Sequence, residues 1–82
     1  MKIDKATDWQ QVRADLKAQY PHHSPDLVHL LCNIDRMVAE LSKTEVEARR
    51  RHKPELLEAE LSCINETIEM VEHYIVMNLL SE

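Results

Sequence analysis

The chain has 82 residues, 44% of them hydrophobic and 30% charged, with a formal net charge of −5, and it contains no Gly. The length fits one small domain, the composition excludes intrinsic disorder, and the acidic balance argues against non-specific nucleic-acid binding. Without Gly, the tight turns of β-proteins and the Gly-rich loops that bind phosphate are hard to build, so we predict an all-α fold.

The chain begins with residues 1–6, which are expected to form a flexible N-terminal tail ahead of a single helical domain at residues 7–82. Thr7 is a candidate N-cap, and Gln10 three positions later completes a capping-box pattern. A short helix over about residues 8–20 then places four apolar residues on one side: Trp9, Val12, Leu16 and Tyr20.

The second helix has the clearest start signal in the sequence. Ser24 is a candidate N-cap, and Pro25 follows at the first helical position, where its fixed φ is favourable. We predict a helix over residues 25–42 or longer. Its apolar residues recur at three- and four-residue spacing, as in an amphipathic helix: Leu27, Leu30, Leu31, Ile34, Met37, Val38 and Leu41.

The segment that follows the second helix is ambiguous. Ser42 and Glu45 would cap a new helix, or the second helix continues, solvated, to Arg51. In either case Pro54 requires a break or a kink near this point. We favour a turn within residues 43–53 that reverses the chain.

The last helix is predicted over residues 54–80, and its main apolar stripe repeats almost as a heptad. This stripe is expected to pack on the second helix in an antiparallel hairpin, with the short N-terminal helix laid across it. Its members are Leu57, Leu61, Ile64, Ile68, Val71, Ile75 and Leu79.

The same helix carries a second apolar face, within an arc of about 60° centred about 130° from the first stripe. The N-terminal helix could cover this face within one chain, but a short helix covers only part of a long one. We therefore favour pairing of two hairpins in a four-helix or larger bundle. The candidate interface residues are Leu56, Ala59, Cys63, Met70, Tyr74 and Met77, with a weaker echo in the second helix at Val28, Cys32, Ala39 and Val46.

One run of residues concentrates positive charge, and it is a candidate anion-binding site. Arginine side chains suit phosphate geometry, and symmetry in an oligomer would bring several such runs together. Basic residues near a helix C-terminus also complement the helix dipole, and a solvated turn is the interpretation we favour. The run consists of Arg49, Arg50, Arg51, His52 and Lys53.

No catalytic motif is present in the sequence. The last helix has an acidic arc that we expect to face water, and a metal-dependent activity on this arc is the weakest of the alternatives, because carboxylates at helical spacing can bind divalent cations. The arc consists of Glu55, Glu58, Glu66, Glu69 and His73. A zinc site would have to combine His29 and Cys32 with Cys63 and with His22 or His23, and zinc-finger spacing is missing. We assign no catalytic residue, no cofactor and no metal.

These patterns predict a small, non-enzymatic protein–protein interaction module that acts as a homo-oligomer, such as an adaptor, regulator or inhibitor among accessory proteins. The alternative is an oligomer that sequesters a phosphorylated small molecule or nucleotide through Arg49–Lys53. The expected partners are a second copy of the chain and another protein, with an anionic small molecule in the alternative and neither nucleic acid nor membrane. A cytoplasmic location is expected.

Overall fold

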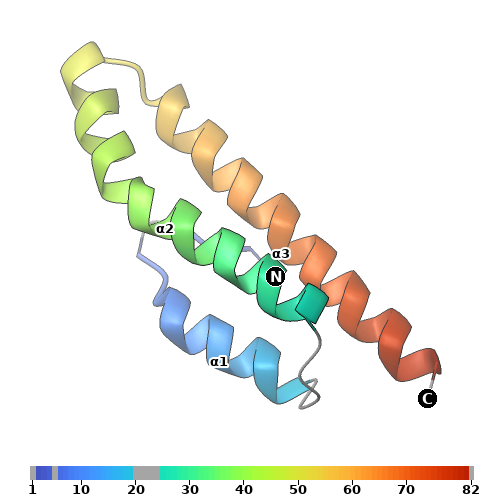
Figure 1. Cartoon of the computed structure of the whole chain (residues 1–82). Helices are drawn as coiled ribbons and strands as arrows, with labels where there is room; N and C mark the ends of the chain where they lie inside the picture. The colour runs from blue at the N-terminus through green and yellow to red at the C-terminus, as the bar shows by residue number, and fades with distance from the viewer. Residues whose placement is uncertain (1, 5, 20–24, 82) are drawn as a thin grey trace.

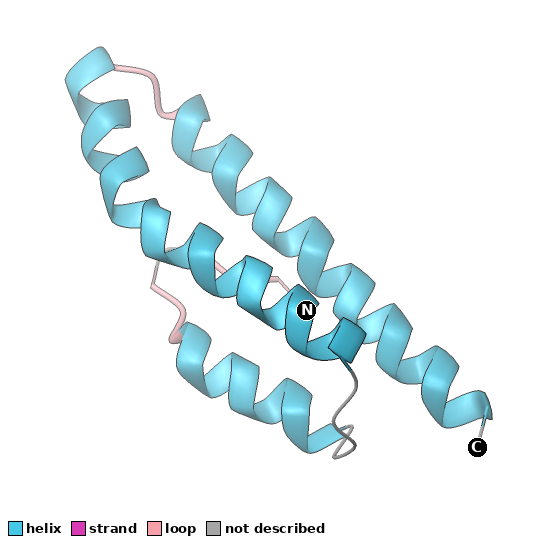
Figure 2. Cartoon of the chain, viewed as in Figure 1, coloured by secondary structure: helices cyan, strands magenta, loops and turns pink. Residues whose placement is uncertain are grey.

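The computed structural model describes residues 2–4, 6–19 and 25–81, with the side chains of Leu79 and Ser81 left aside. Within this part of the chain the regular structure is entirely helical (Figures 1 and 2). Helix α1 spans Trp9–Gln19, α2 spans Pro25–Arg51 and α3 spans Glu55–Ser81. The predicted all-α class is confirmed, and the molecule is elongated at 49 × 19 × 17 Å.

Helices α2 and α3 form a long antiparallel hairpin, with α1 beside the N-terminal half of α2 (Figure 1). At 1.5 Å per residue the 27-residue helices are about 40 Å long, whereas the 11-residue α1 is about 16 Å. A short helix can therefore cover less than half of the hairpin. The packing depends chiefly on the contact between α2 and α3.

The core is a single aliphatic cluster to which all three helices contribute. The predicted stripes supply all of its buried members except Ile3: Trp9, Val12 and Leu16 from α1, Leu27, Leu31 and Ile34 from α2, and Ile64, Ile68, Val71 and Ile75 from α3. Leu57 and Leu61, at the N-terminal end of the α3 stripe, are half-buried. Leu79, Tyr20 and the candidate N-cap Ser24 lie outside the described side chains.

Helix α1 starts one residue later than the capping-box pattern indicates. The carboxylate of Asp8 accepts a hydrogen bond of 3.1 Å from the Gln10 amide, and the Asp8 carbonyl accepts one from Val12, so Asp8 is the N-cap. The Thr7 hydroxyl bonds instead to Asp4 in the preceding turn. The assignment of Thr7 as cap was therefore wrong, because two neighbouring cap formers compete and Thr7 is used upstream.

The N-terminal segment differs from the free tail expected for residues 1–6. Ile3 is 5% exposed and belongs to the core cluster. Its amide donates a 2.7 Å hydrogen bond to Oδ1 of Asn65, and its carbonyl accepts one of 3.0 Å from Nδ2 of the same side chain. A single asparagine on α3 thus pairs both backbone groups of Ile3 and keeps this apolar side chain in the core.

The chain reverses at residues 52–54, at the end of the segment 43–53 in which we favoured a turn. Helix α2 continues to Arg51, as in the alternative interpretation, and no new helix begins at Ser42. His52 adopts a left-handed φ of 54°. The Lys53 amide bonds to the Ala48 carbonyl at 2.9 Å and the His52 amide to Arg49, which is the Schellman pattern of a helix C-terminus. The good helix formers of residues 42–51 prolong α2 until this cap.

Candidate docking face

The second apolar face of α3 is exposed over much of its length. Met70 is 58% exposed and Met77 is 51% exposed, while Ala59 and Cys63 are also exposed. Leu56 and Tyr74 are half-buried, and Tyr74 packs against the edge of the core cluster. The residues predicted as an interface therefore lie together on one face of α3. Four of the six are exposed to water in the single chain.

Helix α1 does not cover this face. Its buried residues join the same cluster as the first stripe of α3. It is also held from the other side of α2, where Asp35 accepts a hydrogen bond from Trp9. Asp35 lies two residues from Asn33, which lines the uncovered side, and two residues correspond to about 200° around a helix. The hairpin therefore has α1 on one side and an uncovered groove on the opposite side.

The uncovered side contains two adjoining hollows of about 500 and 440 Å³, which share Leu30 and Met70. We call them together the open groove. Its apolar floor comes from both helices: Leu30 and Met37 of α2, and Met70, Tyr74 and Met77 of α3. The groove thus combines the second face of α3 with the edge of the α2 stripe.

The rims of the open groove carry charges of opposite sign. Arg36 and Asn33 stand on the α2 rim, and the Arg36 guanidinium donates a hydrogen bond to the Asn33 side chain. Glu66 and Glu69 stand on the α3 rim. Neither glutamate forms an ion pair with any residue that the structure describes. One rim is therefore basic and the other acidic.

A third hollow continues the same side of the hairpin toward the turn. It has a volume of about 480 Å³ and is lined by Lys43, Thr44, Glu47, Arg51, Leu56 and Glu60. Thr44 follows Met37 by seven residues and therefore lies on the same side of α2. Its hydroxyl donates a 3.1 Å hydrogen bond to Glu60 of α3. The uncovered face thus extends along most of the hairpin.

Sequence reasoning missed the α2 half of the groove. Leu30 and Met37 were assigned to the core stripe, and they are half-buried at its edge. Their seven-residue spacing, continued at Thr44, was the signal that could have revealed a second use. The weaker second set of apolar residues on α2 lies elsewhere: Val28 and Val46 are exposed and line no part of the open groove. This set therefore does not continue the second apolar face of α3.

The arginine run is divided by ion pairs within α2. Arg49 pairs with Glu45 at 2.8 Å, whereas Arg50 and Arg51 both pair with Glu47, at 2.5 and 2.6 Å. The hydrogen bond from Arg50 lowers the pKa of Glu47, and the same bond raises the pKa of Arg50. Much of the positive charge is thus compensated locally, which favours a solvated helix end over a phosphate site.

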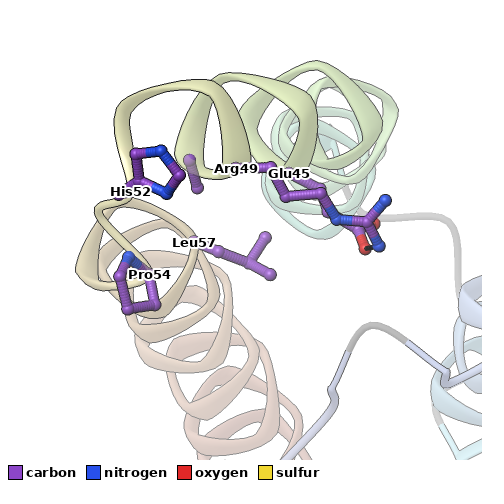
Figure 3. A pocket seen from close by; sticks show the side chains of 6 residues that line it. Glu45, Arg49, His52, Pro54 and Leu57 are labelled. Atoms are coloured by element: carbon purple, nitrogen blue, oxygen red, sulfur yellow. Dashed lines mark hydrogen bonds and ion pairs between the residues drawn. The ribbon is translucent and has the colours of Figure 1, made fainter.

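The turn beside this run forms a hollow of about 360 Å³ between the end of α2 and the start of α3, lined in part by Arg49, His52, Pro54 and Leu57 (Figure 3). Figure 3 shows the Arg49 guanidinium directed away from the His52 ring and toward Glu45. Lys53 and Arg50 are exposed and line neither this hollow nor the one beside Arg51. The five candidate residues do not converge on one site.

The described residues contain no group of three or more His, Cys, Asp or Glu side chains arranged to hold a metal ion. Cys32 and Cys63 are free thiols at exposed positions, and His22 and His23 lie outside the described residues. The acidic arc of α3, from Glu55 to His73, is exposed as expected. Within the same residues, none of the helices has the length and apolar character needed to cross a bilayer.

No protein-family model, curated protein or solved structure matches the chain.

Proposed function

We propose that this chain is a non-enzymatic protein–protein interaction module that acts as a homo-oligomer, with the open groove as its docking surface. The observation that carries the proposal is the exposure of Met70 and Met77 beside half-buried Leu30, Met37 and Tyr74 on one continuous face. An adaptor, regulator or inhibitor works in this way, by burying an apolar surface against another macromolecule.

The size of the chain supports this interpretation. A chain of 82 residues buries a smaller fraction of its surface than a larger domain does, and small domains often depend on a disulfide, a metal or a partner subunit. Both cysteines are free thiols. A partner on the open groove would remove two exposed methionines from water, and the flexible thioether chain of Met adapts well to such a surface.

The test compares two substitutions that place a glutamate on the same helix. Met70→Glu puts a charge in the floor of the open groove, whereas Val76→Glu changes an apolar residue that is similarly exposed, at 53%, and lines none of the groove. The wild-type mass in solution is measured by light scattering after size-exclusion chromatography, and by native mass spectrometry.

We expect a wild-type dimer or larger oligomer, a dissociation constant at least about tenfold higher for Met70→Glu, and little change for Val76→Glu. Helix content by circular dichroism should be the same in all three proteins. A wild-type chain that stays monomeric at every concentration would overturn the homo-oligomer. Equal effects of both substitutions would show that the groove is not the interface.

A further inference from the structure

We infer that the occupant of the open groove is a second copy of this chain in one particular arrangement, in which α3 of each protomer packs against α2 of the other. This inference rests on the proposed function and names the partner's orientation. The two-fold axis then runs parallel to the helices, and the turns of both hairpins lie at the same end of a four-helix bundle.

The charge of α3 disfavours the simplest alternative. Its charged residues are six glutamates, with neither Lys nor Arg between Glu55 and Ser81. In a dimer whose axis crosses the helices, α3 would lie on the partner's α3, and two acidic helices would face each other. Like charges at close range are destabilising, and α3 brings to this contact the rim glutamates Glu66 and Glu69 with neither Lys nor Arg to offset them.

Helix α2 is the complementary surface for α3. On the uncovered side it offers Arg36 at the open groove, which pairs with no carboxylate among the described residues. In the hollow near the turn it offers Lys43 and Arg51, whose charges are shared with Glu40 and Glu47 of the same helix. In an arrangement with α2 on the partner's α2, these basic residues would also meet one another. When α3 packs against the partner's α2, acidic and basic residues lie opposite each other at both of the symmetric contacts.

The levels of the charges along the hairpin agree with this arrangement. Arg36 lines the same hollow as Thr67 and Met70, so it lies level with the part of α3 that carries Glu66 and Glu69. A two-fold axis parallel to the helices preserves this level. Each Arg36 therefore comes to the height of the other protomer's Glu66, and symmetry makes the contact twice.

Glu66 is the favoured acceptor because it precedes Met70 by four residues and so shares its side of α3. Neighbouring helices in this bundle are antiparallel both within and between protomers, so that the helix dipoles also oppose favourably. The apolar floor holds the two hairpins together, while the charged rims select which helix faces which.

The experiment uses charge reversal on the full chain and measures the dimer dissociation constant by sedimentation at low ionic strength. Arg36→Glu should raise it roughly tenfold, because reversal replaces attraction with repulsion at both symmetric contacts. The double variant Arg36→Glu/Glu66→Arg should restore most of the wild-type affinity. The matched control, Arg36→Glu/Glu58→Arg, moves the compensating charge to a residue that lines no part of the open groove and lies about 12 Å along α3 and about 80° around it from Glu66, so it should restore little.

The outcomes separate this inference from the proposed function. If α2 faced the partner's α2, Arg36→Glu would exchange one like-charge contact for another, and neither the single nor the double variant would change affinity. A dimer that is sensitive to Met70→Glu and insensitive to charge reversal at Arg36 would overturn the arrangement and leave the interaction module standing. A wild-type monomer would overturn both.

Discussion

The indole nitrogen of Trp9 donates a 2.6 Å hydrogen bond to Oδ1 of Asp35, across 26 residues of sequence. The other carboxylate oxygen lies 3.1 Å from Nε of Arg13, one turn further along α1. One side chain on α2 therefore holds α1 at two points. This anchor directs α1 to one side of the hairpin and leaves the opposite groove open.

Removal of the Asp35 carboxylate should loosen α1. The Trp9 side chain is 4% exposed, and a buried indole N–H without an acceptor is costly. We expect Asp35→Ala to lower the free energy of unfolding by about 1–3 kcal/mol. Urea denaturation, followed by the fluorescence of Trp9 at a fixed protein concentration, measures this change.

Asp35→Asn is the control for the anchor, since its side-chain oxygen still accepts the indole hydrogen bond. It loses only the charge opposite Arg13, and that pair is partly exposed, with side chains 25% and 34% accessible. The cost should therefore be about 1 kcal/mol or less. Equal losses for the two variants would mean that the indole contact contributes nothing.

The contact between Ile3 and Asn65 should make the N-terminal segment part of the folded unit. Ile3→Ala removes buried aliphatic volume and should cost about 2 kcal/mol or more, whereas Lys2→Ala, at an exposed position, should have little effect. Asn65→Ala should expose the Ile3 amide to hydrogen exchange. An Ile3 amide that exchanges as fast in the wild-type protein as in Asn65→Ala would contradict this prediction.

The left-handed conformation of His52 should cost stability that Gly would recover. A residue with a Cβ at this position pays about 1–2 kcal/mol, partly offset because Gly has more conformational freedom when unfolded. We expect His52→Gly to raise the free energy of unfolding by about 0.5–1 kcal/mol. His52→Ala retains the Cβ and should bring no such gain, so a similar gain for both variants would argue against backbone strain.

Much of the fold could be predicted because the periodicity of apolar residues depends only on the local sequence of each helix. Spacings of three and four residues separate Ile64 and Ile68, which are buried, from Met70 and Met77, which are exposed. The same spacing indicated that α3 has two apolar faces before any partner helix was placed. Periodicity predicts which residues share a face, because it depends only on the geometry of one helix.

Helix ends were predicted less well, because neighbouring residues compete for the same role. Thr7 and Asp8 are both good caps, and the hydrogen bonds of Thr7 with Asp4 decide in favour of Asp8. In a chain without Gly, Pro54 limits how far α2 can extend but no Gly marks its last turn, and His52 takes the left-handed position that Gly usually holds. The arginines of the candidate anion site are also subject to local competition, since Glu45 and Glu47 pair with them within the same helix.

The sequence by itself determined that the chain is all-helical and that α3 carries a second apolar face, since both follow from composition and from periodicity within one helix. Only the tertiary structure decided that α1 covers the first stripe, that Ile3 joins the core and that Leu30 and Met37 help to form the open groove. These outcomes depend on contacts between distant residues, such as Trp9 with Asp35 and Ile3 with Asn65. No local pattern records such contacts, because they exist only once the helices have packed.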